Sequence, residues 1–399
     1  MRLVLALVLL LSSLSPSDQW WLKDYQFDQT RFDGSGVVVA VIDTGIDDTH
    51  PDLSGRFVTG RDFSGLGSPD GTAPVGPSSY HGTMVASLIA GQGETSGGVI
   101  GVAPGVSLMS LSIGLGVSGA DTDQQIADAM IWAVDNGAKV INLSLTRNSR
   151  TWPASWDEAF LYALENDVVV VSASGNRPDG SGSPSAPGTM PGVLSVGGLT
   201  KSKAGSERSS TEGIAIDITA PAEDLFGSFP GGEIRSWAGS SAAAPLVSGL
   251  VALMRQADPA ASANDILQRL IASSDDLGEP GFDGVFGFGA INPTQALSSR
   301  LTAEENPLGS LAQWVSLYRA QSTEDQAELQ TPQEPVFVPE PAPSALENVD
   351  IAPDNTELWQ PNPLLYWVLA PLAPLLWLVW RRRRKAALAT KSQEGKTEV

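Results

Sequence analysis

The sequence predicts an α/β fold, a doubly wound parallel sheet with helices on both faces. Three runs of apolar residues carry this prediction: residues 36–44 (GVVVAVIDT), 139–145 (KVINLSL) and 168–174 (VVVVSAS). Continuous runs rich in Val and Ile are typical of parallel strands that are covered on both faces. Polar residues stand at their C-terminal ends, the edge at which open α/β sheets bind ligands and place chemistry.

Length and composition bound the domain organisation and exclude several kinds of site. The chain has 399 residues, so we expect one large domain, residues 18–300, with further segments attached to it. It contains no cysteine, which excludes disulfide bonds, thiolate metal sites and a cysteine nucleophile. Its formal net charge of −21 argues against nucleic acid as a partner, because phosphates require clustered Lys and Arg.

The first 17 residues are predicted to be a signal peptide. One basic residue, Arg2, precedes an unbroken apolar stretch over residues 3–11, and small polar residues follow. Cleavage after Ser17 would place Ser15 and Ser17 at the two recognition positions. The alternative is a buried first strand or helix. The signal peptide predicts that the domain behind it is exported.

The C-terminal part predicts a tethered membrane anchor. Residues 301–362 are interpreted as an acidic, Pro-rich linker, because residues 321–362 hold no Lys or Arg. Residues 364–380 (LLYWVLAPLAPLLWLVW) are uncharged and long enough for a transmembrane helix, and the basic tail, residues 381–399, begins with RRRRK. The alternative is a buried hairpin. We expect a single-pass protein of the bacterial cell membrane with its C-terminus in the cytoplasm.

Two candidate site residues carry ionisable side chains. Asp43 ends the first apolar run in the segment VIDTG, where a cap or turn aspartate is the alternative. His81 opens the segment HGTMVASLIAG, whose apolar residues recur at helical spacing. The chain has only one other histidine, His50, which we interpret as a packing or hydrogen-bonding residue of its loop. A histidine base therefore has few candidates, and a structural histidine is the alternative for His81.

Two further candidates carry an amide and a hydroxyl. Asn176 follows the third apolar run in SASGN, where it is either a turn residue or a donor to an oxyanion. Residues 239–245 read GSSAAAP, which is either a serine-capped helix start or a nucleophilic serine at a helix N-terminus. Small neighbours there would let a substrate backbone approach.

The ordered set VIDTG, HGT, SASGN and GSSAAAP resembles the subtilisin-like serine proteases, the subtilases, over residues 19–299. The resemblance implies that Asp43 orients His81, that His81 acts as general base and then general acid, and that Ser241 is the acylated nucleophile. It also implies an oxyanion hole made by the Asn176 amide and the Ser241 backbone N–H. Substrate would bind along Ser144, Leu145, Thr146, Ala173, Ser174 and Gly175.

The chain departs from the subtilase pattern near its expected substrate strand. Ser144-Leu145-Thr146-Arg147 stands where the family usually has SLGG, and Ser240 stands where it usually has threonine. Bulk and charge at Thr146 and Arg147 argue against the broad apolar preference usual in the family. No cofactor is predicted. Calcium sites are common in subtilases, but Asp47, Asp48 and Asp52 are interpreted as solvated loop residues rather than as a metal site.

The architecture as a whole is similar to the mycosins, membrane-anchored proteases of type VII secretion. A signal peptide, the segment QWWL at residues 19–22, a subtilase domain and one anchor with a basic tail carry this narrower resemblance. It implies protein or peptide substrates, the cell membrane and a type VII secretion complex as partners. The predicted function is a membrane-anchored extracytoplasmic serine endopeptidase. The alternative is a component that braces a secretion complex, with proteolysis secondary or absent.

Overall fold

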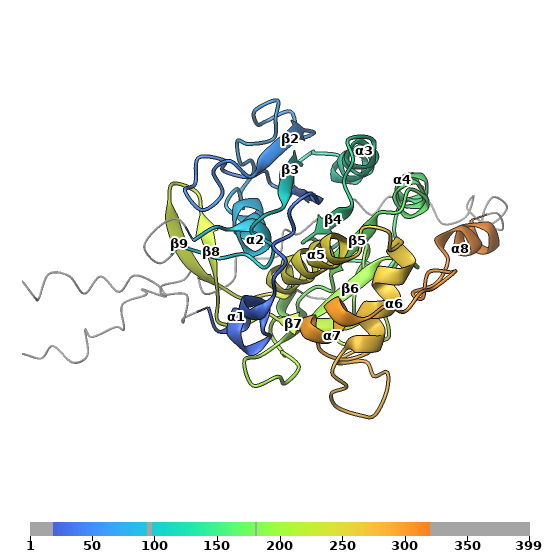
Figure 1. The fold of residues 1–399 in the computed structure, drawn as a ribbon. Helices are drawn as coiled ribbons and strands as arrows, with labels where there is room; N and C mark the ends of the chain where they lie inside the picture. Colours follow the sequence, from blue (N-terminus) through green and yellow to red (C-terminus); the bar gives the residue numbers. More distant parts are fainter. Residues whose placement is uncertain (1–18, 94–97, 180–181, 320–399) are drawn as a thin grey trace, which may run out of the picture. The chain divides into compact units, whose positions relative to one another are not determined.

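The fold is built on a seven-stranded parallel sheet, and the computed structural model describes residues 19–93, 98–179 and 182–319 (Figure 1). The strand order is β2-β3-β1-β4-β5-β6-β7, and every neighbouring pair is parallel. The three apolar runs form β1, β4 and β5. The strands are β1 (Val38–Asp43), β2 (Phe57–Asp62), β3 (Ser107–Ser112), β4 (Val140–Leu143), β5 (Val169–Ala173), β6 (Leu194–Leu199) and β7 (Ile218–Pro221).

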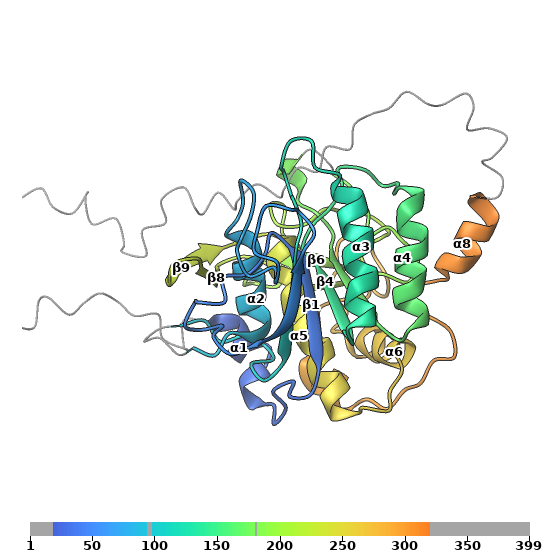
Figure 2. The ribbon, with the colours of Figure 1, turned by 90° about the horizontal axis from the view of Figure 1, so that it is seen from above.

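Helices cover both faces of the sheet, as the sequence predicts. Figure 2 shows α3 (Thr122–Asp135) and α4 (Ala154–Glu165) on one side of β1, with α2 (His81–Ala90) and α5 (Ser240–Ala257) on the other. Alternate side chains of β1 enter the two cores. Val39 and Val41 pack with residues of α2 and α5, whereas Ala40 and Ile42 pack with residues of α3 and α4. This two-sided burial explains the continuous apolar runs.

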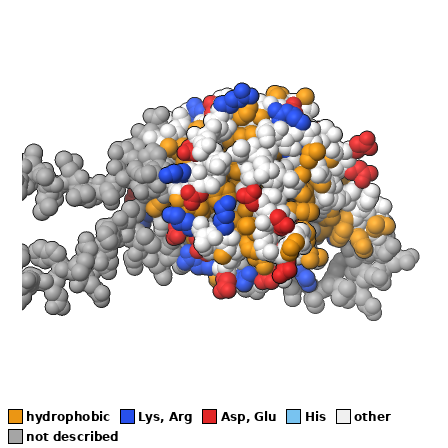
Figure 3. All heavy atoms as spheres, turned by 60° about the horizontal axis from the view of Figure 1, so that its bottom comes forward, with side chains coloured by type: hydrophobic (Ala, Val, Ile, Leu, Met, Phe, Trp, Pro, Cys, Tyr) orange, Lys and Arg blue, Asp and Glu red, His pale blue; other side chains and the backbone are white. Residues whose placement is uncertain are grey.

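Shorter elements complete the fold around this sheet. An antiparallel hairpin, β8 and β9, stands apart from the main sheet and packs on α2. The remaining elements are α1 (Trp20–Asp24), the 3₁₀ helices η2 (Phe27–Gln29) and η3 (Arg177–Asp179), β8 (Leu225–Phe229), β9 (Glu233–Trp237), α6 (Ala263–Ser273), α7 (Pro293–Ser298) and α8 (Leu311–Tyr318). On the face drawn in Figure 3, acidic and basic side chains are interspersed.

The folded chain continues beyond the predicted domain end at residue 300. Residues 301–319 were expected to begin the linker, but α8 packs against α4 there. Leu311 is buried, and the Trp314 ring lies 4.3 Å from that of Trp152. Arg319 Nε donates to Asp157 at 2.7 Å. The expectation of a linker from residue 301 is wrong for this stretch, because apolar residues at helical spacing give α8 a face to bury.

The predicted signal peptide (1–17), transmembrane helix (364–380) and basic tail (381–399) lie outside the described residues. Within the three described ranges, no helix is both long enough and apolar enough to cross a membrane.

Candidate active site

Asp43 and His81 form a buried pair at the C-terminal edge of the sheet. Asp43 is the last residue of β1 and His81 is the first of α2, and both side chains are shielded from solvent. Nδ1 of His81 lies 2.9 Å from each carboxylate oxygen of Asp43. A Cβ at Gly82 would collide with the carbonyl oxygen of Gly45, so glycine after the histidine lets α2 approach β1. The carboxylate therefore holds the imidazole in one orientation and favours the tautomer protonated at Nδ1.

Ser241 lies in the first turn of α5, which packs directly beside α2. Its hydroxyl donates to the Ser144 carbonyl at 2.9 Å, and the Ser144 hydroxyl donates to the Ser241 carbonyl at 3.0 Å. Within α5, the Ser241 carbonyl would normally accept from the backbone four residues later, but Pro245 has no N–H. Ser144 supplies the missing donor. Pro245 of GSSAAAP thus leaves the Ser241 carbonyl available for the hydrogen bond that joins the start of α5 to the segment after β4.

Asn176 lies on the other side of the α5 N-terminus. Its Oδ1 accepts from the backbone N–H of Ser240 at 3.0 Å, which holds the amide group at the start of the helix. The Ser240 hydroxyl accepts from Gly175 N at 3.0 Å. Sequence reasoning gave Ser240 no part in the site, yet its backbone and side chain hold residues 175 and 176 in place. The sequence does carry one signal for this function, because Ser240 keeps a hydroxyl where the family usually has threonine.

An aromatic residue that sequence reasoning missed completes the surroundings of the histidine. Trp237, the last residue of β9, is buried, and its ring stands edge-on to the His81 ring, with centroids 5.5 Å apart at 86°. Tyr80, which precedes His81 in the sequence, stacks on Phe229 of β8 with centroids 5.3 Å apart. These rings help to exclude water from the imidazole. Only the hairpin brings Trp237 and Phe229 there, so no local signal marked them.

The predicted substrate-binding residues lie in two segments that leave neighbouring strands. Ser144, Leu145 and Thr146 follow β4, while Ala173 ends β5 and Ser174 and Gly175 follow it. The side chains of Leu145 and Ala173 are buried in the two cores, so these residues could offer a substrate only their backbone. Thr146 is partly exposed. The structure thus brings both segments to the two sides of Ser241.

Arg147 does not direct its charge toward the site as the sequence suggested. Its guanidinium lies 2.9 Å from the Asp123 carboxylate and 5.6 Å from the centre of the Trp156 ring. Burial lowers the pKa of Arg147 and raises the pKa of Asp123, and the attraction between the two charges opposes both shifts. The Arg147 charge is therefore paired on the side of the sheet where α3 and α4 lie. Of the two residues, Thr146 is the one that could add bulk near the substrate.

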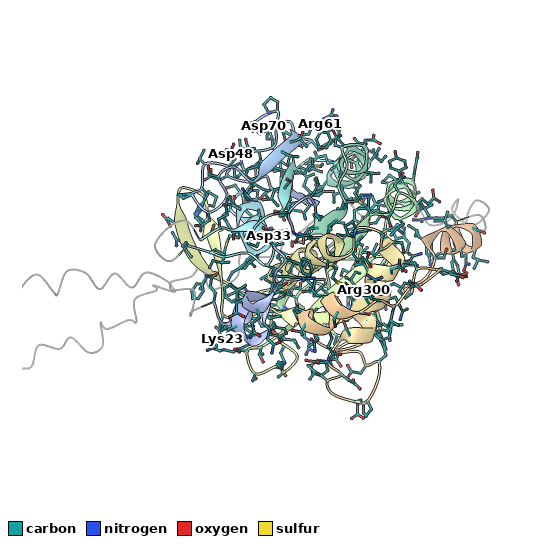
Figure 4. The ribbon with its side chains drawn as sticks, viewed as in Figure 1. Lys23, Asp33, Asp48, Arg61, Asp70 and Arg300 are labelled. Carbon is teal, nitrogen blue, oxygen red and sulfur yellow. The ribbon has the colours of Figure 1, made fainter. Side chains whose placement is uncertain are left out.

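The second histidine and the acidic loop are structural. His50 Nε2 lies 3.1 Å from the Glu233 carbonyl oxygen, which confirms its interpretation as a hydrogen-bonding loop residue. Asp52 differs from the expected solvated residue, because it is buried and accepts from Val99 N and Ser228 Oγ, each at 2.9 Å. Asp48 is on the surface of the same region (Figure 4). The described ranges hold no group of three or more carboxylate or histidine side chains placed to hold a metal ion.

The sequence matches the subtilase family over residues 34–289. The chain belongs to the subtilase family. The structure agrees with this assignment. The sheet is parallel, and one edge of it carries Asp43, His81, Asn176 and Ser241.

Several known subtilases are similar to the chain. It is 34% identical over 275 residues to the thermophilic serine proteinase of Bacillus sp. (strain AK1), covering 69% of this chain and 65% of that protein. It is 36% identical over 263 residues to subtilisin Savinase of Lederbergia lenta, covering 66% and 91%. The structure of MycP1 from the ESX-1 type VII secretion system matches with a TM-score of 0.62 and 25% identity, covering 74% and 91%. The chain thus spans under two thirds of the first relative.

Proposed function

We propose that this subtilase is a serine endopeptidase that hydrolyses peptide bonds through an acyl-enzyme formed on Ser241. The observation that carries the proposal is the buried pair of Asp43 and His81, whose Nδ1 lies 2.9 Å from both carboxylate oxygens. A buried carboxylate that fixes an imidazole beside a serine at a helix N-terminus is the arrangement that activates a hydroxyl for acyl transfer. Its similarity to named serine proteases supports the same reaction.

The first chemical step moves one proton and forms one bond. His81 Nε2 takes the proton of Ser241 as Oγ attacks the substrate carbonyl carbon, and Asp43 stabilises the imidazolium that results. The Ser241 hydroxyl donates to the Ser144 carbonyl at 2.9 Å, so this hydrogen bond must break before the proton can pass to the imidazole. A substrate N–H that binds the Ser144 carbonyl would release the hydroxyl for this transfer. The imidazolium then protonates the leaving amine.

The developing negative charge requires donors at the α5 N-terminus. The amide nitrogen of Asn176 and the backbone N–H of Ser241 are the proposed pair. The hydrogen bond from Ser240 N to Asn176 Oδ1 supports this proposal, because it holds the amide group at the start of α5 before substrate arrives. Water activated by His81 then hydrolyses the acyl-enzyme by the reverse sequence of proton transfers.

A serine-directed fluorophosphonate probe tests this chemistry. Wild-type protein should be labelled, and Ser241→Ala should abolish both labelling and cleavage of a peptide library. Ser202→Ala is the matched control, because Ser202 is exposed on the surface. A wild-type protein that is correctly folded and exported but neither labels nor cleaves any peptide would contradict the proposal.

We further propose that the domain works outside the cell as part of a membrane-anchored protein. The apolar residues 3–11, the uncharged residues 364–380 and the basic block after them support this topology. Because the chain has no cysteine, Ser322→Cys and Ser392→Cys each provide one labelling site. An impermeant thiol reagent should label only Ser322→Cys in intact cells and both variants after permeabilisation. Labelling of Ser392→Cys in intact cells would overturn the topology.

A second candidate function is structural support of a type VII secretion complex. The similarity to the MycP1 structure favours it, because that protein comes from such a system. Ser241→Ala separates the two functions, since it removes the nucleophile and leaves the folded domain in place. If this variant fully complements a deletion while wild-type protein shows no cleavage, the structural function is the primary one. N-terminal proteomics of cells carrying each form would identify substrates if cleavage is primary.

A further inference from the structure

We propose that α8 positions the predicted substrate-binding segment 144–146 through the loop 147–152, and that release of α8 weakens peptide binding while Ser241 stays reactive. The inference rests on the proposed peptidase function and adds an element that controls substrate binding. It is carried by the contacts of Arg319 and Trp314 with the end of this loop, and by the contacts that hold its first residue.

α8 forms a clamp around Trp152, the last residue of the loop. The Trp152 ring lies 4.3 Å from that of Trp314, and the Arg319 guanidinium lies 5.9 and 5.3 Å from the centres of these two rings. Arg319 Nη2 also donates to the Trp152 carbonyl at 2.9 Å. A guanidinium over an indole adds a cation–π attraction to this hydrogen bond. The clamp therefore holds both the side chain and the backbone of Trp152.

The clamp is also fastened to the start of α4. The Asp157 carboxylate accepts from Arg319 Nε and from Trp152 Nε1, each at 2.7 Å. α8 lies beside α4 and continues the layer that α3 and α4 form (Figure 2). Asp157 is buried, and removing the partner of a buried charge is costly. Loss of the Arg319 guanidinium would therefore loosen the Trp152 end of the loop.

The first residue of the loop, Arg147, is held on the same part of α4. Its guanidinium lies 2.9 Å from the Asp123 carboxylate and 5.6 Å from the centre of the Trp156 ring. Trp156 Nε1 donates to the Asp123 carbonyl at 2.9 Å. Trp156 and Asp157 are adjacent in the first turn of α4. The two ends of the loop are thus held by neighbouring residues of one helix, and Arg319 supports one of them directly.

The loop sets the position at which the substrate-binding segment ends. The start of this segment is fixed by the hydrogen bonds between Ser144 and α5. Its end continues directly into Arg147, whose backbone N–H donates to the Ala186 carbonyl at 2.7 Å. Ala186 N in turn donates to the Ser149 carbonyl at 2.8 Å. A loop released at its far end would strain or break these bonds and let the segment move.

Release of α8 should therefore act on substrate binding rather than on the reacting groups. Asp43, His81 and Ser241 belong to β1, α2 and α5, and none of these elements forms the clamp. An extended peptide, by contrast, would lose contacts along the displaced segment. The chain runs from Arg319 directly into the predicted linker, so α8 joins the substrate-binding side of the domain to the predicted anchor.

The test measures kcat and KM of the full chain with an extended peptide substrate, and titrates Ser241 with a fluorophosphonate. Arg319→Ala and Trp314→Ala should each raise KM by about threefold or more, within the roughly 2- to 30-fold that couplings through packed contacts reach. The kcat per labelled enzyme should stay within about twofold, as expected for independent sites. Gln313→Ala, at an exposed position of α8, is the matched control and should leave KM unchanged.

A conservative variant and hydrogen exchange identify the route. Arg319→Lys keeps a charge for Asp157 but loses the flat guanidinium over the two indole rings, so its KM should lie between those of wild type and Arg319→Ala. Amide hydrogen exchange of residues 147–152 should be faster in Arg319→Ala than in wild type or Gln313→Ala. A raised KM without faster exchange in this loop would overturn the proposed route.

The outcomes also separate this proposal from the peptidase function. A merely structural α8 would lower cleavage only in proportion to the labelled fraction of enzyme, with KM unchanged. That result, in a wild-type protein that labels and cleaves, overturns the positioning function alone. Absence of both labelling and cleavage in wild-type protein overturns the peptidase function, and the effect on substrate binding with it. Arg319→Lys keeps the test decisive if Trp314→Ala fails to fold.

Discussion

Ser144 and Ser241 exchange two hydrogen bonds, each serine donating its hydroxyl to the backbone carbonyl of the other, at 3.0 and 2.9 Å. The pair is part of a buried chain. Asn142 Nδ2 donates to Ser144 Oγ at 3.0 Å, and Ser248 Oγ donates to Asn142 Oδ1 at 2.9 Å. Two residues of α5 are thereby fastened to the end of β4. Because Pro245 leaves the Ser241 carbonyl without a helical donor, the Ser144 hydroxyl has a structural function that a methyl group cannot replace.

Ser144→Ala should lower the free energy of unfolding by about 1–3 kcal/mol, because it leaves the Ser241 carbonyl and the Asn142 amide without a buried partner. Urea denaturation would measure the loss. Ser202→Ala, at an exposed position, should change stability by no more than about 0.5 kcal/mol. Adding Pro245→Ala to Ser144→Ala restores a helical N–H and should recover part of the loss. An unchanged urea midpoint in Ser144→Ala would rule out this function of the pair.

Asn176→Ala should reduce kcat by about 10²- to 10³-fold with little change in KM, a magnitude known from subtilisin itself for the loss of an oxyanion donor. The donor acts mainly on the transition state, which explains the split between the two constants. Ser240 N also loses its acceptor in this variant, so thermal unfolding must be measured in parallel. A kcat within threefold of wild type, in a folded variant, would remove Asn176 from the proposed oxyanion hole.

Asp217→Asn should stabilise the protein at alkaline pH. Burial raises the pKa of Asp217 to about 7, while a hydrogen bond from Ser195 N at 2.7 Å opposes the shift. A raised carboxyl pKa means that the stabilising contribution is complete below the unfolded value near 3.8 and is lost as pH rises through about 7. Above that range the folded protein must hold an ionised, poorly solvated carboxylate.

Thermal unfolding at pH 5 and pH 8 checks this expectation. The Asn variant keeps an oxygen for Ser195 N and removes the charge, so its Tm should exceed that of wild type at pH 8 by more than at pH 5. Asp28→Asn, an exposed carboxylate on η2, provides the matched control. The same Tm difference at both pH values would show that Asp217 does not titrate between them.

Trp21→Ala should destabilise the domain by about 3–5 kcal/mol, the usual cost of removing a large buried aromatic side chain. Trp21 is fully buried in α1, and its ring lies 6.4 Å from that of Phe226 in β8. The start of α1 is also held by hydrogen bonds, since Trp20 Nε1 donates to the Asp224 carbonyl and Gln19 accepts from Ile100 N. Lys23→Ala on the exposed side of α1 should cost little. Equal urea midpoints for the two variants would contradict the structural importance of α1.

The candidate site was predictable to the extent that its signals are local. Asp43, His81, Asn176 and Ser241 each stand in a short motif, and each motif adjoins a strand or helix whose apolar pattern is visible in the sequence. Trp237 and α8 escaped prediction for the opposite reason. Trp237 reaches the His81 ring only because the β8–β9 hairpin packs on α2. The apolar face of α8 has a packing partner only in the folded chain, where Trp314 contacts Trp152 of the loop before α4.

The sequence by itself determined the parallel sheet, because strands buried on both faces require continuous apolar residues, and it determined the order of the chemical groups along the chain. Only the tertiary structure decided how those groups meet. Ser144 and Ser241 are 97 positions apart, and their exchange of hydrogen bonds depends on β4 and α5 packing together. The same packing turned Arg147 toward Asp123 and left Thr146 facing Gly175. Side-chain direction follows from contacts between segments distant in sequence, which no local pattern records.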